Sequence, residues 1–154
     1  MNATRSLATV ALVLALVLVL AGAAWAEPVL VGDLRGIFGA TCRVYRDGDH
    51  VGVAVRMDGV LHVVAMQRDQ AVLLANTLED AWESRMALSV GESRIAGQVA
   101  SASGNSVYVA VNRKGPGARP IVAVAAKDET LGCAFFDQAG QVRYLANTLR
   151  RAAR

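Results

Sequence analysis

The chain has 154 residues, with 16 basic and 13 acidic side chains and a formal net charge of +3. That length suffices for one modest hydrophobic core, and so weak a charge excludes the concentrated basic surface of nucleic-acid-binding proteins. Basic residues gather only at Arg113-Lys114 and in the tail Arg150-Arg151-Arg154, where a solvated loop and a solvated tail account for them. We therefore expect no nucleic-acid partner.

The first 26 residues have the organisation of an export signal. An uncharged apolar run from Leu7 to Leu20 is followed by Ala24-Trp25-Ala26, the small-x-small pattern at which signal peptidase cleaves. The alternative is an uncleaved anchor, because the uncharged stretch from Ser6 to Ala26 is long enough to span a bilayer. The favoured interpretation is a signal peptide at 1–26 and a single domain at 27–154. It predicts a periplasmic or secreted protein with no membrane span once the signal is removed.

Cys42 and Cys133 are the only cysteines. In an exported chain an even number of cysteines favours a disulfide, and two cysteines leave one possible pairing. Such a bridge would close a long loop and contribute about 4–5 kcal/mol by the chain-entropy relation. Two buried free thiols are the alternative.

The segment Ala40–Met66 is typical of three antiparallel strands. In Ala40–Arg46, Cys42 and Val44 alternate with Arg43 and Tyr45, and in Val51–Met57 valines alternate with small residues. Both patterns indicate strands with one buried face. Asp58-Gly59 favours a type I′ hairpin turn, because both central residues of that turn need positive φ. The sequence therefore predicts a three-stranded meander that ends with a strand over Val60–Met66.

The remaining elements are also mostly strands. For the run Asp69–Ser89 we expect a strand at Ala71–Ala75 and then a helix over about Leu78–Leu88, capped by Asn76 or Thr77. Five further strands are predicted at Arg94–Val99, Val107–Asn112, Ile121–Ala126, Leu131–Asp137 and Gln141–Ala146. The expected fold class is mainly β, a compact antiparallel sheet of about nine short strands with one helix, closed as a small barrel or a sandwich.

A long segment of the chain occurs twice. Val51–Ala81 aligns without gaps on Val122–Ala152 with identity at 11 of 31 positions, and Leu-Ala-Asn-Thr-Leu at Leu74–Leu78 recurs whole at Leu145–Leu149. An internal duplication explains the intact pentapeptide, and chance matches in a chain rich in Ala and Val are the alternative. If the duplication is real, the two copies share one structure. The tail Arg150–Arg154 is then expected to fray as a helix.

The sequence contains few candidates for a catalytic or metal-binding site. The sequence contains no HExxH, CxxC or GxSxG motif and no glycine-rich phosphate loop, so we expect no metal site and no cofactor. The repeat aligns His62 with Cys133, and these two with Asp58 are the candidates for a small thiol- or His-dependent enzyme. A half-buried strand histidine and a bridged cysteine explain the same residues, and we expect a protein that is not an enzyme.

The loop Ser101–Tyr108 is the candidate binding element, through Ser103, Gly104, Asn105 and Tyr108. The segment Gln98–Tyr108, with Lys114-Gly115 downstream and Cys42 and Cys133 at the ends, resembles the periplasmic lysozyme inhibitors of the membrane-bound C-type class. These are small β-barrels whose Ser-Gly-x-x-Tyr loop enters the lysozyme cleft. The spacing departs from that pattern, because three residues rather than two separate Gly104 from Tyr108. The aromatic residue expected before Lys-Gly is also absent. A Ser/Gly-rich hairpin loop is the competing interpretation, and the family is not assigned.

The expected function is that of an exported, non-catalytic binding or envelope-associated module. Its partner would be an unidentified protein or envelope component. An inhibitor of a secreted or cell-wall enzyme, acting through Ser101–Tyr108, and a small enzyme are the two alternatives.

Overall fold

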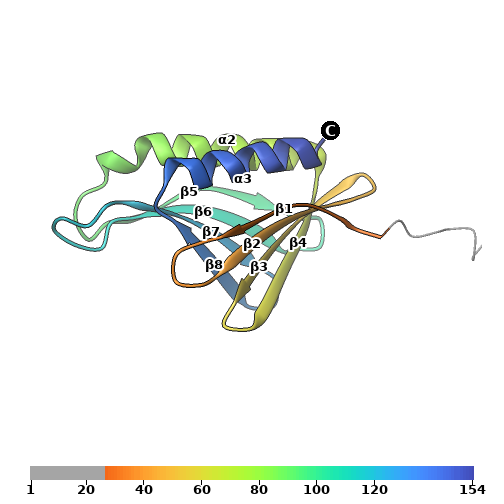
Figure 1. Ribbon diagram of the computed structural model, residues 1–154, viewed down its shortest axis with the longest axis horizontal. Coiled ribbons are helices and arrows are strands. Elements are labelled where there is room, and N and C mark those ends of the chain that lie inside the picture. The colour runs from red at the N-terminus through yellow and green to blue at the C-terminus, as the bar shows by residue number, and fades with distance from the viewer. Residues whose placement is uncertain (1–26) are drawn as a thin grey trace, which may run out of the picture.

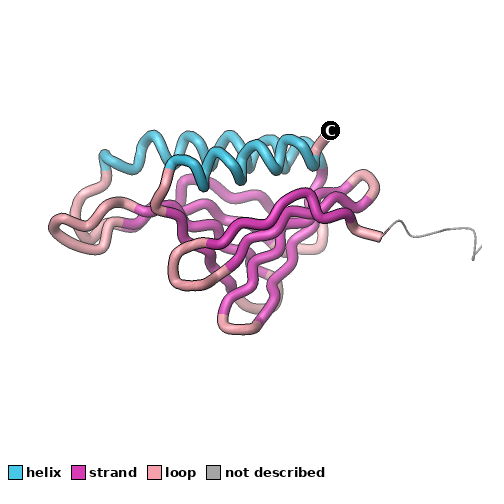
Figure 2. The backbone as a smooth tube through the Cα atoms, viewed as in Figure 1, coloured by secondary structure: helices cyan, strands magenta, loops and turns pink. Residues whose placement is uncertain are grey.

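The computed structural model describes residues 27–154, and the predicted export signal at 1–26 lies outside them. The described chain forms two four-stranded antiparallel sheets, each followed in sequence by a helix (Figures 1 and 2). Sheet A has the strand order β1 (Val29–Arg35), β2 (Thr41–Asp47), β3 (His50–Met57) and β4 (Val60–Gln67), and is followed by α2 (Arg68–Ser84) and the short 3-10 helix η1 (Arg85–Ala87). Sheet B has the order β5 (Ser93–Ala100), β6 (Ser106–Asn112), β7 (Ile121–Lys127) and β8 (Leu131–Phe136), and α3 (Ala139–Ala152) follows it.

The predicted mainly β, antiparallel fold class is confirmed, but its details need correction. The described residues contain eight strands and two α-helices, not nine strands and one helix. The strands form two separate sheets and do not close into one barrel within residues 27–154. The strand β1 is absent from the predicted elements, because a bulge between Leu30 and Gly32 interrupts the alternation of its side chains.

Both segments that contain Leu-Ala-Asn-Thr-Leu are helical, so the strands predicted at Ala71–Ala75 and Gln141–Ala146 are wrong. The helix predicted over Leu78–Leu88 begins at Arg68. Each helix starts with the same capping box, in which the N–H of the first glutamine donates to the side chain of a glutamine three residues later. The buried residues then recur at helical spacing: Ala71, Leu74, Ala75, Leu78 and Ala81 in α2, and Val142, Leu145, Ala146, Leu149 and Ala152 in α3.

The structure repeats one unit of four strands and a helix. The strand pair Thr41↔Arg56 of sheet A corresponds to Ser106↔Lys127 of sheet B. The first strand of each sheet carries a bulge that ends at a glycine, Gly32 in β1 and Gly97 in β5. The sequence repeat is therefore a structural repeat, and it also includes the first two strands of each sheet, which the ungapped alignment does not reach.

The two helices are exchanged between the sheets. Helix α2, which continues from sheet A, packs mainly on β5 and β6, whereas α3 packs on β1 and β2 (Figure 1). The side-chain amide of Gln70 donates to the carbonyl of Ala100 at 2.8 Å, and the equivalent amide of Gln141 donates to Arg35 at 3.2 Å. Each sheet is thus covered by the helix of the other copy, so neither copy can bury its own apolar face alone.

Two close approaches explain the threonine in the repeated pentapeptide. A Cβ atom on Gly97 would lie 2.6 Å from Cγ2 of Thr77, and one on Gly32 would lie 2.6 Å from Cγ2 of Thr148. Each threonine hydroxyl donates to the carbonyl four residues earlier in its helix. The bare backbone of each glycine therefore lets the opposite copy's helix approach the first strand closely.

The helices run antiparallel beside each other (Figure 1) and are joined by an ion pair between equivalent positions. Arg150 of α3 donates to the two carboxylate oxygens of Glu79 at 3.0 and 2.5 Å, and to Oδ1 of Asn76 at 2.8 Å. The hydrogen bond from Arg150 lowers the pKa of Glu79. The predicted solvated, fraying tail is wrong at this point, because α3 continues to Ala152 and Arg150 faces its neighbour.

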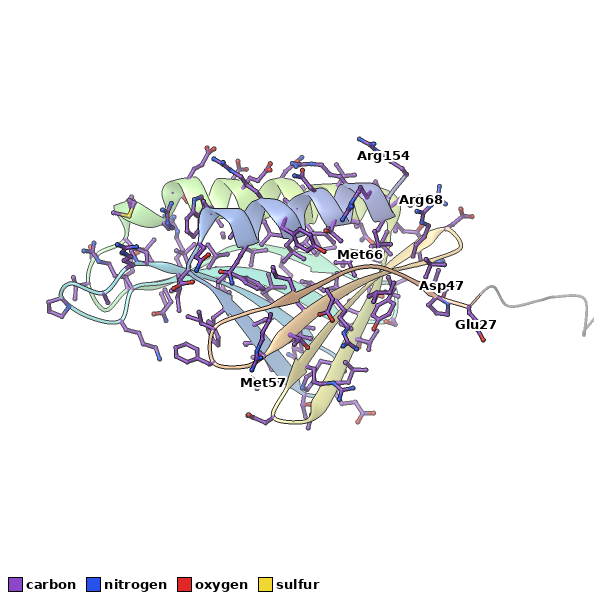
Figure 3. All side chains as sticks on the ribbon, in the orientation of Figure 1. Glu27, Asp47, Met57, Met66, Arg68 and Arg154 are labelled. Carbon is purple, nitrogen blue, oxygen red and sulfur yellow. The ribbon has the colours of Figure 1, made fainter. Side chains whose placement is uncertain are left out.

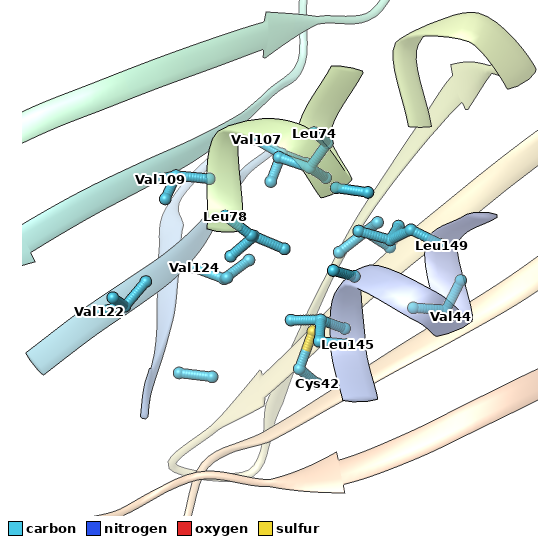
Figure 4. Close-up of a cluster of buried hydrophobic side chains, with 14 of the residues drawn as sticks. Cys42, Val44, Leu74, Leu78, Val107, Val109, Val122, Val124, Leu145 and Leu149 are labelled. Atoms are coloured by element: carbon cyan, nitrogen blue, oxygen red, sulfur yellow. The ribbon is translucent and has the colours of Figure 1, made fainter. Parts of the chain in front are cut away.

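One hydrophobic core lies between the helices and the inner faces of both sheets (Figure 4). The leucines of the two pentapeptides meet valines from both sheets there: Leu74, Leu78, Leu145, Leu149, Val44, Val107, Val109, Val122 and Val124. Full burial of each such side chain contributes about 1.5–3 kcal/mol. The strands also carry side chains on the faces turned away from the helices (Figure 3), and these outer faces differ between the sheets.

Candidate functional site: an apolar groove on sheet B

The outer face of sheet B, turned away from the helices, is apolar along the middle of β7 and β8, and its uncharged polar residues Ser93, Gln98, Ser106 and Asn112 lie on β5 and β6. The strand register places Tyr108, Ala125 and Cys133 in one row across β6, β7 and β8. The next row holds Ile95, Ala110, Ala123 and Phe135. The residues between them, including the valines of β6, point into the core.

These rows enclose a groove of about 660 Å³ with a floor of small side chains. Ala123 and Ala125 of β7 are only 6% and 7% exposed although they point away from the core. Taller side chains stand on either side of them: Ile95 and Tyr108 from β5 and β6, and Leu131, Cys133 and Phe135 from β8. Polar residues lie only toward the ends of the floor strand, with Lys127 at one end and Ser93 and Asn112 toward the other. The volume is typical of small-molecule sites.

The equivalent face of sheet A carries charged residues where sheet B has none. Where sheet B has Gln98 and Tyr108, sheet A has Asp33 and Arg43, whose side chains pair at 3.1 Å. Arginines also stand at the positions equivalent to Ala100 and Lys127. The row equivalent to Ile95, Ala110, Ala123 and Phe135 is uncharged in sheet A as well, and consists of Leu30, Tyr45, Gly52 and Ala65. Because the two sheets share one architecture, the fold does not require an apolar outer face. A contiguous exposed apolar patch of this kind marks an interaction site.

Phe38 of the β1–β2 loop extends the apolar surface of sheet B. The N–H of Ile37 donates to the carbonyl of Phe135 at 2.8 Å, which ties this loop to β8. The Phe38 ring packs edge-on against Phe135 with the ring centroids 5.9 Å apart, yet it is 77% exposed. Its positive φ of 65° is uncommon for a bulky residue. The first copy thus contributes to the margin of the groove in the second.

Three of the four residues of the predicted binding loop, Ser103, Gly104 and Asn105, lie outside the groove. Tyr108 lies within β6 and forms part of the groove wall. Ser103 and Gly104 lie in the β5–β6 turn, where the hydroxyl oxygens of Ser101 and Ser103 are 2.9 Å apart and Gly104 has a positive φ. Asn105 lines a separate, polar hollow. Of the predicted residues, only Tyr108 belongs to the groove.

Both cysteines are free thiols, and the predicted bridge is not formed. Cys42 points from β2 into the core, where burial raises the pKa of its thiol to about 12. Cys133 points out of β8 into the groove, and partial burial raises the pKa of its thiol as well. The apolar neighbours of Cys133 indicate a core position from sequence, but both faces of sheet B are apolar, so they do not distinguish the inner face from the outer.

The buried residue His62 connects the two sheets. Its Nδ1 atom lies 3.2 Å from Oδ1 of Asp128 and 3.4 Å from Oγ1 of Thr130. Asp128 also accepts the backbone N–H groups of Thr130 and Val63. These contacts, first that of the Thr130 N–H and then that of His62, hold the pKa of Asp128 below its ordinary value. The partner of His62 is therefore Asp128, whereas the enzyme hypothesis requires Cys133.

The strand register also changes the position equivalent to His62. His62 pairs with Val55 in sheet A, and the corresponding pair in sheet B is Gly132 with Ala126. The β7–β8 turn is one residue shorter than the β3–β4 turn, so the ungapped alignment with Cys133 fails here. The His62 ring fills the space above Gly132, where a Cβ atom would lie 2.1 Å from Cδ2 of His62.

The Asp128 contacts predict a pH-dependent contribution to stability. The folded-state pKa of Asp128 is lowered, so its contribution is present above the unfolded pKa of about 3.9 and is lost as the pH falls through the lower folded value. We expect Asp128→Asn to lower the urea midpoint at pH 7. The difference in midpoint between the variant and the wild type should become smaller as the pH falls toward 3. Asp58→Asn, in the equivalent turn, is the control and should leave the midpoint unchanged. A deficit of equal size at both pH values would contradict the prediction.

No protein-family model, curated protein or solved structure matches this chain. Among residues 27–154, no cluster of three or more His, Cys, Asp or Glu side chains could hold a metal ion. No helix of that range is both long and apolar enough to cross a bilayer.

The sequence signal for the groove is the continuous apolar composition of β7 and β8. In β7, Ile121–Ala126 is apolar at every position, and in β8 Leu131–Phe136 contains no polar residue apart from its cysteine. Continuous apolar runs are typical of strands covered on both faces. In this sheet the helices cover one face only, and the apolar residues of the other face line the groove.

Proposed function

We propose that this protein is an exported, non-catalytic binding module that holds a small apolar ligand in the groove on the outer face of sheet B. The carrying observation is the contrast between the two sheets. At equivalent positions, sheet A presents the Asp33–Arg43 ion pair and sheet B presents Gln98 and Tyr108 around a floor of alanines. A ligand between the walls would remove the exposed apolar surface of residues such as Ile95 and Leu131 from water, at a gain of about 25 cal/mol per Å².

The export part of the proposal rests on the sequence of residues 1–26. A protein released outside the cytoplasm would meet lipids and other apolar molecules of the cell envelope, which fits the predicted envelope-component partner. The arrangement of two sheets around a shared core is closer to an open sandwich than to a barrel, and the open outer face of one layer supplies the site.

The inhibitor and the enzyme are less well supported. An inhibitory loop would present Ser103, Gly104 and Tyr108 together, but Tyr108 lies within β6 and forms part of the groove wall. An enzyme built on His62 needs a nucleophile beside it, but Cys133 points to the opposite face of sheet B from the His62 ring.

The proposal is tested with the neutral fluorescent probe N-phenylnaphthylamine and the purified 27–154 protein. We expect saturable binding to the wild type. The double variant Gln98→Asp/Tyr108→Arg, which transfers the sheet A ion pair to sheet B, should weaken binding about tenfold or more, a loss of about 1.4 kcal/mol. The matched control, Asp33→Gln/Arg43→Tyr on sheet A, should bind as the wild type does. Equal binding by all three proteins would overturn the proposal.

A further inference from the structure

We propose that the ligand is a single-chain anionic amphiphile, such as a free fatty acid, whose hydrocarbon chain lies along β7 and whose headgroup meets Lys127. This inference rests on the proposed function and adds to it the chemistry and orientation of the ligand.

The groove selects against a ligand with polar groups along its length. The backbone N–H and C=O groups of the two central strands β6 and β7 are engaged in the sheet ladder, so the floor offers no backbone hydrogen bonds to a bound peptide. Two polar side chains of the groove bond within the protein: the Asn112 amide nitrogen donates to Ser93 at 2.6 Å, and the Tyr108 hydroxyl accepts from Gln98 at 3.3 Å. Oδ1 of Asn112, at the end away from Lys127, is buried and has no hydrogen-bond partner among residues 27–154. A buried peptide group without partners would pay its full desolvation cost. A hydrocarbon chain has no such groups.

The dimensions of the floor fit one alkyl chain. The low floor is one strand wide at Ala125, between Tyr108 on β6 and Cys133 on β8, and widens to β6 at Ala123, whose neighbour in the row is Ala110. Backbones of the two flanking strands lie about 10 Å apart, twice the spacing between neighbouring strands. An α-helix with its side chains is about 10–12 Å across and is too wide for the part of the floor beside Tyr108. From Ile121 to Lys127 the floor strand extends about 20 Å, the length of a long-chain fatty acid in extended form.

Lys127 gives the groove a direction. It is the one charged residue that lines the groove, and among residues 27–154 no carboxylate lies within ion-pair distance of it. It lies in the same row as Ser106 and Leu131, two residues beyond the alanine floor. An anionic headgroup at this end would meet the Lys127 ammonium, while the chain follows β7 away from it.

The test compares two amphiphiles with the same chain and opposite charge, laurate and dodecyltrimethylammonium, each below its micelle concentration. Displacement of N-phenylnaphthylamine from the 27–154 protein is the measurement. We expect laurate to displace the probe at a concentration about five- to tenfold lower, because one ligand is attracted and the other repelled by the same cation. Lys127→Glu should reverse this order. The control Arg56→Glu, at the equivalent position of sheet A, should leave the order unchanged.

The outcomes separate the two proposals. If both amphiphiles displace the probe equally, or if the laurate preference survives in Lys127→Glu, the headgroup inference is overturned while the groove remains a binding site. If neither displaces the probe and the groove variants do not change probe binding, the proposed function fails as well. Binding of laurate only as part of anionic vesicles, and not as the free amphiphile, would also overturn the inference.

Discussion

Replacing Gly132 by alanine is expected to lower the free energy of unfolding by about 2–4 kcal/mol. The new methyl carbon would lie 2.1 Å from Cδ2 and 2.8 Å from Cγ of His62. The ring cannot turn aside easily, because it is 3% exposed and its Nδ1 atom is held by Asp128 at 3.2 Å. Urea denaturation followed by circular dichroism gives the change in unfolding free energy.

The double variant His62→Ala/Gly132→Ala identifies the cause of this loss. Removing the ring alone leaves a cavity and frees Asp128, so His62→Ala is also expected to destabilise the protein. Because the second alanine occupies part of that cavity, the double variant should be more stable than the sum of the two single changes predicts, by about 1–3 kcal/mol. Simple additivity would mean that the His62 ring does not occupy the space above Gly132.

Replacing Gly97 by alanine is expected to cost about 1–3 kcal/mol, because the added methyl carbon would lie 2.6 Å from Cγ2 of Thr77. Thr77→Ser removes that methyl group and keeps the hydroxyl that bonds to the helix backbone. In the Gly97→Ala background it should therefore restore most of the lost stability, as measured by the urea midpoint.

The matched control uses the other copy of the pentapeptide. Thr148 contacts Gly32 and not Gly97, so Thr148→Ser should not relieve Gly97→Ala. Rescue by Thr148→Ser and not by Thr77→Ser would mean that each helix covers its own sheet, contrary to the exchange described above.

Several local features could be predicted from sequence because short-range chemistry decides them. The three-stranded meander over Ala40–Met66 is present as β2, β3 and β4. Asp58 and Gly59 both have positive φ, 52° and 82°, as the predicted type I′ turn requires. The Leu-Ala-Asn-Thr-Leu repeat marks equivalent parts of the two copies.

The strands predicted at Ala71–Ala75 and Gln141–Ala146 are wrong because the start of a helix has the composition of a turn. From sequence, Asp137–Gly140 is typical of a turn between two strands, and this pattern favours strands at Gln141–Ala146 and, by analogy, at Ala71–Ala75. In the structure Gln138 is the N-cap of α3 and the helix begins at Ala139. A glutamine at the cap position and another three residues later are a weaker helix signal than Ser or Thr with Glu. The capping boxes of Gln67 and Gln138 therefore become recognisable only when both copies are known to be helical.

The sequence by itself determined the mainly β composition, the repeat and the turn at Asp58-Gly59, because periodicity, identity and turn chemistry act between residues close in the chain. Only the tertiary structure decided which helix covers which sheet, which residue faces His62, and that Cys42 and Cys133 point to different surroundings. Those outcomes depend on strand register. Because the β7–β8 turn is one residue shorter than the β3–β4 turn, Gly132 and not Cys133 is the equivalent of His62, and the His62 ring lies against it. The groove has the same origin, since an apolar residue on a strand can face the core or the outside, and only the position of the helices shows that Ala123 and Ala125 face outward.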